Sequence, residues 1–119
     1  MILAALLLAM ADAPAQAGFY MSNQMEIGAA LQLDEDGKFQ YQLDYGAVSE
    51  AAEGKWSVEG GTVYLTATRM EGAYKTHNFS REPLKIDGDR LLLNRYDTVI
   101  RFEREALPVP AGQNKNLGE

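Results

Sequence analysis

The sequence contains no cysteine, one histidine and one tryptophan among its 119 residues. A chain without cysteine forms neither disulfides nor thiolate metal sites, and it offers no cysteine for a lipid anchor. The single histidine, His77, has no second histidine or cysteine with which to complete an ordinary zinc or copper site. The sequence therefore predicts no metal site and no cofactor.

Basic residues are outnumbered as well, with 11 lysines and arginines against 17 aspartates and glutamates and a net charge of −6. A protein that binds nucleic acid needs clustered positive side chains to neutralise the phosphate backbone. We therefore predict no nucleic-acid partner.

The stretch from Met1 to Ala11 is almost wholly apolar, and the small-residue pattern Ala15-x-Ala17 follows it. This pattern is typical of a signal peptide cleaved before Gly18. The alternative is a membrane-spanning helix, but crossing a bilayer takes about twenty apolar residues. No lysine or arginine precedes the apolar run, which leaves open a start further upstream or a poor signal. We predict a signal peptide over 1–17, a periplasmic or secreted protein, and no membrane span in the mature chain.

Removal of residues 1–17 takes away one charge, Asp12, so that 16 acidic residues of the original 17 remain against 11 basic ones, a net charge of −5. About a hundred residues then remain, which is the usual size of one domain with one core. We predict a β-barrel domain over 18–104. The stretch 105–119, rich in proline and polar residues, is typical of a disordered tail.

Two alternating runs meet at Gly60-Gly61 and predict a β-hairpin with one buried face. If the glycine pair is the whole loop, the expected cross-strand pairs are Glu59 with Thr62, Val58 with Val63 and Trp56 with Leu65.

The same alternation recurs along the chain, with turns at Asp34 to Gly37 and at Asp87 to Asp89. Pro83 lacks an amide hydrogen for a sheet ladder, so we expect a bulge or a sheet edge there. The inward positions that we predict on these strands are Ile27, Ala29, Leu31, Leu33, Phe39, Tyr41, Leu43, Tyr45, Phe79, Leu84, Ile86, Leu91, Leu93, Ile100 and Phe102.

About eight strands and no sustained helical periodicity predict an all-β fold. Sequential hairpins favour an antiparallel up-and-down meander that closes into a small barrel, because closure removes exposed strand edges. A two-sheet sandwich is the alternative.

Successive connections of a meander alternate between its two ends. The tight turns therefore share one end, and the longer connections Gly46 to Gly54, Arg69 to Thr76 and Asn94 to Asp97 share the other. A helical turn fits Ala51 to Glu53 in the first of them. Long loops on one rim are where binding residues usually lie, although such residues also simply solvate an open rim. The predicted ligand-binding residues are Tyr45, Glu50, Arg69, Tyr74, His77, Arg95 and Tyr96.

Three motifs carry a family resemblance: Gly18-x-Tyr20, then Leu31-x-Leu33-x-x-Asp36-Gly37-x-Phe39-x-Tyr41, then Gly54-x-Trp56-x-Val58-x-Gly60-Gly61-x-Val63-x-Leu65. From Gly18 to Thr68 the chain resembles small lipocalin-like barrels of the bacterial envelope, including the N-terminal domain of the NlpE copper-resistance lipoprotein. The resemblance implies an envelope barrel associated with ligand binding, metal stress or surface sensing. This chain lacks the cysteines of NlpE, which argues against copper or redox sensing.

Other chemical motifs are weak. Asp34-x-Asp36-Gly37 begins like a calcium loop, but the later oxygen ligands are missing, and a hairpin turn explains it. His77 combined with a serine lacks the Gly-x-Ser-x-Gly elbow of a hydrolase. We therefore predict that the protein is not an enzyme.

Two functional hypotheses follow. The first is an exported lipocalin-like module that binds a small apolar or amphipathic ligand and has a cavity beneath the long loops. The second is an envelope protein-interaction or stress-response factor with a solid barrel core. The inward aromatic side chains either line the cavity or fill the core, and a barrel of this size favours filling.

Overall fold

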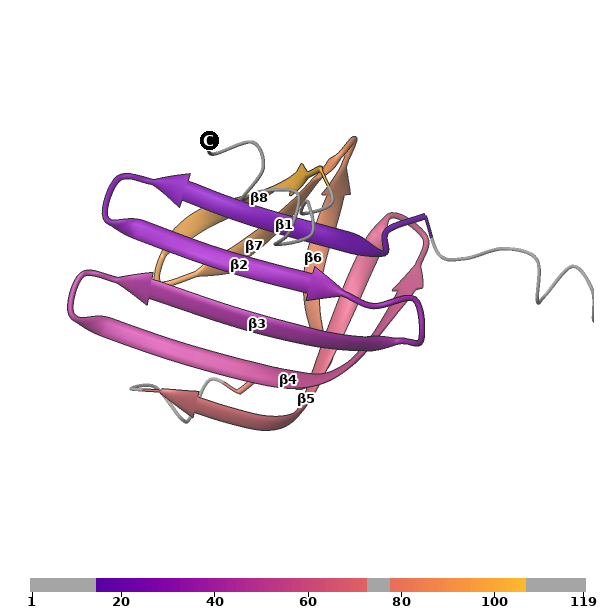
Figure 1. The fold of residues 1–119 in the computed structure, drawn as a ribbon, viewed down its shortest axis with the longest axis horizontal. Coiled ribbons are helices and arrows are strands. Elements are labelled where there is room, and N and C mark those ends of the chain that lie inside the picture. Colours follow the sequence, from indigo (N-terminus) through magenta and orange to yellow (C-terminus); the bar gives the residue numbers. More distant parts are fainter. Residues whose placement is uncertain (1–14, 73–77, 107–119) are drawn as a thin grey trace, which may run out of the picture.

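The computed structural model describes residues 15–72 and 78–106, which form eight antiparallel β-strands and no helix. Each strand pairs with the next, and β1 also pairs with β8, so the meander closes into a barrel, as predicted (Figure 1). The strands are β1 (Gly18–Gln24), β2 (Ile27–Leu33), β3 (Lys38–Tyr45), β4 (Val48–Glu59), β5 (Thr62–Gly72), β6 (Glu82–Asp87), β7 (Arg90–Arg95) and β8 (Thr98–Glu105).

Alternation in the sequence becomes alternation in burial. Along β2 and β3 each second side chain is buried and the residues between them are mostly exposed. Every predicted inward residue is buried except Tyr45 and Ile86, which are partly buried and pack against the core. Full burial of a large apolar side chain contributes about 1.5–3 kcal/mol, so this inward face supplies most of the driving force for closure.

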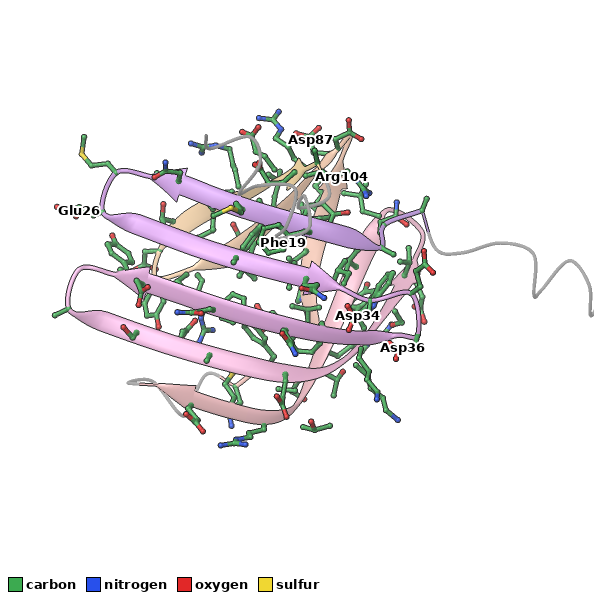
Figure 2. The ribbon with its side chains drawn as sticks, viewed as in Figure 1. Phe19, Glu26, Asp34, Asp36, Asp87 and Arg104 are labelled. Carbon is green, nitrogen blue, oxygen red and sulfur yellow. The ribbon has the colours of Figure 1, made fainter. Side chains whose placement is uncertain are left out.

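The hairpin around Gly60-Gly61 has the predicted register, since Glu59 pairs with Thr62 and Trp56 pairs with Leu65. The Trp56 indole Nε1 donates to the carbonyl oxygen of Asp34 at 2.8 Å. This bond ties the hairpin to the β2–β3 turn. Asp34 and Asp36 of that turn lie at the right of Figure 2, whereas Glu26 of the β1–β2 turn lies at the left, at the other end of the barrel.

We call these two ends the closed end and the mouth. The closed end has the β2–β3, β4–β5 and β6–β7 turns, and the mouth has the β1–β2, β3–β4 and β7–β8 turns and the β5–β6 connection.

All three long connections predicted at the mouth need correction. The stretch Gly46 to Gly54 is a two-residue turn, Gly46-Ala47, followed by β4, and Ala51 to Glu53 is extended rather than helical. In this stretch Ala52 points inward and its two neighbours point outward, so the period is that of a strand.

At the end of β7, Asn94 and Arg95 also belong to the strand, and the turn consists of Tyr96 and Asp97. Both turn residues have positive φ, 56° and 57°, as a tight two-residue hairpin requires. The prediction for Arg69 to Thr76 needs correction as well, because β5 continues through Gly72. Only the β5–β6 connection remains long, and its residues 73–77 lie outside the described residues.

Pro83 lies at a local sheet edge, one of the two predicted alternatives, and not at a bulge. It pairs with Tyr64 in unbroken register, at a point where β6 is paired with β5 and has not yet begun to pair with β7. The register shift lies instead between Glu53 and Gly54 of β4. A Cβ at Gly54 would lie 2.2 Å from the carbonyl oxygen of Thr66. The backbones of β4 and β5 can therefore lie this close only because residue 54 is glycine.

Candidate functional site at the mouth

Glu50 of β4 lies inside the barrel with 4% of its surface exposed. Its Oε2 accepts hydrogen bonds from the Tyr41 hydroxyl at 2.6 Å and from Arg95 Nε at 2.5 Å. Its Oε1 accepts bonds from Arg95 Nη2 at 2.8 Å and from the Tyr96 hydroxyl at 2.5 Å. We call these four residues the Glu50 cluster. Hydrogen bonds to an ionised carboxylate are stronger than neutral ones, so the cluster holds β3, β4 and the β7–β8 hairpin together.

The strand pattern brings these side chains together. Glu50 is opposite Leu43 and Tyr41 is opposite Ala52, so Tyr41 and Glu50 are diagonal neighbours on the inner face. Arg95 continues the inward row of β7 after Leu91 and Leu93. The polar groups of β3 and of the β7–β8 hairpin therefore meet at the Glu50 carboxylate of β4.

Gly72 makes room for this carboxylate. It pairs with Glu50, and a Cβ added to it would lie 2.6 Å from the Glu50 Cβ. Its φ is 148°, a value that favours glycine. The end of β5 can therefore approach Glu50 only because residue 72 has no side chain.

Burial and hydrogen bonding act on the pKa of Glu50 in opposite directions. Burial raises the pKa, but the bonds from Arg95, Tyr41 and Tyr96 outweigh it, so that the pKa lies below its usual value of 4.5. Burial and the bond to Glu50 raise the pKa of Tyr96 to about 12, and the same two causes raise the pKa of Tyr41 further. At neutral pH both tyrosines are therefore donors to an ionised carboxylate.

Aromatic rings surround the cluster on the mouth side. The rings of Tyr45 and Tyr96 meet edge to face with centroids 5.7 Å apart. The Arg95 guanidinium carbon lies 5.0 Å from the Phe79 ring centroid and 5.2 Å from that of Tyr96, within the range of cation–π attraction. The cluster is thus enclosed by apolar surface, which strengthens its electrostatic interactions.

Strand pairing stops short of the mouth on one side of the barrel. β5 pairs with β6 only from Thr62 to Leu65, and the pairing of β6 with β7 reaches only Leu92. Beyond these points no other described strand pairs with the facing edges of β5 and β7. We call this part of the wall, where described strands are not paired, the seam. In Figure 1 the end of β5 swings away from β6 on this side.

Phe79 lies in the seam and belongs to no strand. Its side chain is 2% exposed and meets the Tyr41 ring at a centroid distance of 4.8 Å. Its backbone carbonyl accepts a bond from Ala67 N at 2.9 Å, and its N–H donates to Met70 Sδ at 3.3 Å. A thioether is a weak acceptor, so the Phe79 N–H is bonded less strongly than an N–H that donates to a carbonyl oxygen.

Four of the seven predicted site residues come together: Glu50, Arg95 and Tyr96 within the cluster, and Tyr45 against Tyr96. Arg69 does not join them, because it points outward from β5 and pairs with Glu71 at 2.8 Å with its side chain 68% exposed. It instead lines a separate hollow with Ala51, Ala52, Glu53 and Glu71. Tyr74 and His77 lie outside the described residues.

Tyr41 and Phe79 are site residues absent from the predicted ligand-binding set; the sequence favoured core filling for them over lining a cavity. A signal for Tyr41 was present, because a hydroxyl on an inward row needs a buried partner. Glu50 is in phase with Ala52 and Trp56, which would have identified that partner once β4 was extended back to Val48.

The described residues hold no group of three or more histidine, aspartate or glutamate side chains arranged to bind a metal ion, and no helix that could span a bilayer. Searches of known protein families, curated proteins and solved structures found no significant match to this chain.

Proposed function

We propose that this protein is an exported, non-enzymatic, lipocalin-like module that binds a small apolar or amphipathic molecule at the mouth of its barrel. The observation that carries the proposal is Phe79, whose ring occupies the interior at the seam. The ring fills a space that an apolar ligand would use if Phe79 moved out.

The backbone hydrogen bonds of Phe79 add little to the free-energy cost of moving this residue out of the interior. The Phe79 carbonyl accepts one bond from Ala67 N, and its N–H donates to the Met70 sulfur, a weaker acceptor than the carbonyl oxygen that a strand N–H normally meets. The ring itself contributes the burial energy of an aromatic side chain, and a ligand that fills the same space would restore it.

The Glu50 cluster supplies the polar groups of the proposed site. Tyr41 and Arg95 of the cluster lie beside the Phe79 ring, so a ligand that replaced this ring would meet polar groups as well as apolar ones, which suits an amphipathic ligand better than a pure hydrocarbon. The same geometry argues against catalysis by Glu50, because both of its oxygens already accept two bonds.

Export and the envelope location rest on the leader pattern that ends at Ala17 and on the envelope-barrel motifs between Gly18 and Thr68. The likeness to the NlpE domain remains part of this proposal.

The test is the binding of 1-anilinonaphthalene-8-sulfonate, an amphipathic fluorescent probe, to folded protein. We expect Phe79→Ala to bind the probe more tightly than wild type, because removal of the ring empties the space at the seam. The matched control is Phe102→Ala, which removes the same ring from a fully buried position on β8, a strand paired on both sides. Equal binding by the two variants, with native circular dichroism, would contradict the proposal.

One observation favours the second candidate, an envelope interaction or stress-response factor. The described inward side chains pack as a core, with Phe79, Tyr41 and Phe39 in ring contact. A solid barrel of this kind would use its outer surface and turns to bind a protein. Failure of every apolar probe to bind either wild type or Phe79→Ala would favour this reading.

A further inference from the structure

The residues just before β1 are bound to the closed end of the barrel. Arg104 Nη1 donates to the carbonyl oxygen of Ala17 at 2.8 Å, and Nη2 donates to that of Ala15 at 2.8 Å. The Tyr20 hydroxyl donates to the carbonyl oxygen of Gln16 at 2.7 Å and accepts a bond from Arg104 Nη2 at 2.8 Å. Three successive carbonyls therefore dock on one arginine and one tyrosine. Figure 2 labels Arg104 beside the start of β1.

These contacts belong to the fold. Tyr20 is only 1% exposed, and its ring stacks with the Arg104 guanidinium at 5.0 Å from the centroid. A buried hydroxyl that loses its acceptor costs about 1–3 kcal/mol. Ala17 also packs against the hydrophobic core. The segment thus seals the closed end.

A cut before Gly18 would remove all three carbonyls. It would also leave a positive α-ammonium at Gly18, where an added Cβ would lie 2.6 Å from Arg104 Nη1. A positive α-ammonium beside the Arg104 guanidinium is repelled by it, and Tyr20 would be left without the acceptor that Gln16 supplies.

A cut before Gln16 would keep the essential contacts. Gln16 and Ala17 would still accept bonds from Tyr20 and Arg104, and Arg104 Nη2 would keep the Tyr20 hydroxyl after the loss of Ala15. The new ammonium would lie two residues further from the start of the strand.

The sequence permits both cuts, because signal peptidase reads small residues at the third and first positions before the bond. Ala15 and Ala17 fit a cut before Gly18, and Ala13 and Ala15 fit a cut before Gln16. A third pattern, Ala11 and Ala13, is followed by Pro14, whose ring and missing N–H obstruct cleavage of the bond before it.

We propose that the leader is removed between Ala15 and Gln16, so that Gln16 and Ala17 stay in the mature protein as the seal of its closed end. This inference rests on the proposed export. It replaces the cut before Gly18 that the Ala15-x-Ala17 pattern predicts.

The test is expression of the full chain in a Gram-negative host, followed by intact-mass spectrometry and fragmentation of the periplasmic protein. We expect Gln16 as the first residue, either free or cyclised to pyroglutamate with loss of ammonia. A first residue of Gly18 would overturn the inference while leaving export supported. An uncut chain in the cytoplasm would overturn export itself, and this inference with it.

Two variants separate the sites, since Ala13 is read only for the cut before Gln16 and Ala17 only for the cut before Gly18. Ala17→Gln should be processed as wild type is. Ala13→Gln should lose the product that starts at Gln16. The reverse pattern would overturn the inference even if the folded yield of either variant is low, because cleavage is scored on total exported chain.

Discussion

At the closed end of the barrel, polar side chains bond mainly to backbone carbonyls, as in the bonds from Trp56 to Asp34 and from Arg104 to Ala15 and Ala17. At the mouth the interior holds an ion pair with four hydrogen bonds on one carboxylate, beside the seam. The closed end follows from burial, from turn chemistry and from side-chain bonds to backbone carbonyls. The mouth combines a costly buried charge with a stretch of wall where described strands are not paired, and under the proposed function this end is the one that binds.

The largest effect should come from breaking the Glu50 cluster on one side. Glu50→Gln keeps the shape of the side chain but leaves the Arg95 guanidinium buried without its counter-charge. Loss of one partner of a buried pair costs about 3–5 kcal/mol. Urea unfolding should show this loss in the free energy of unfolding. The double variant Glu50→Gln with Arg95→Met should recover part of it, and an unchanged single variant would mean that the cluster is not held as described.

Acid should act on the same cluster with a smaller effect. Because the folded pKa of Glu50 lies below its unfolded value of 4.5, its contribution to stability is fully present above that value. The contribution is lost as the pH falls through the folded pKa. The free energy of unfolding, measured between neutral pH and pH about 3, should therefore fall more steeply in wild type than in Glu50→Gln. Parallel curves would contradict the assignment.

At the closed end, Trp56→Phe should cost less. The ring stays buried, but the Asp34 carbonyl loses one of its two donors and keeps the Gly37 N–H at 3.0 Å, and the net contribution of such a hydrogen bond is about 0.5–1.5 kcal/mol. Chemical denaturation again gives the value. If this loss exceeded that of Glu50→Gln, the contrast between the two ends would be reversed.

The smallest effect is expected for Arg69→Met. The Arg69 and Glu71 side chains are 68% and 65% exposed, and ion pairs on the surface contribute about 0–1 kcal/mol. The variant should also leave probe binding at the seam unchanged. A large loss of stability or of probe binding would mean that Arg69 belongs to the site after all, despite its outward position.

Much of the barrel was predictable because one rule, period-two alternation, governs both the strands and the core. The register around Gly60-Gly61 followed from a two-residue loop. The errors arose where polar or small residues occupy inward positions, as Glu50 and Ala52 do in β4. There the pattern is that of a strand, but the composition is that of a loop.

The site was predicted in part for an analogous reason. Topology placed Tyr45, Glu50, Arg95 and Tyr96 at one end, and the structure brings them together. The rim was expected to hold them on long loops, whereas strands and tight turns hold them. Phe79 was predicted to be buried, but nothing in its own sequence context shows that it belongs to no strand, since that depends on where β5 and β6 cease to pair.

The most direct test of the proposed function is native mass spectrometry of the protein purified from its own envelope, compared with its denatured mass. If the seam admits an apolar or amphipathic ligand, the native protein should carry an extra mass that is lost on denaturation. In Phe79→Ala the fraction that carries it should rise. A clean mass for both proteins, unchanged after incubation with envelope lipids, would contradict the binding module and leave a protein partner to be found.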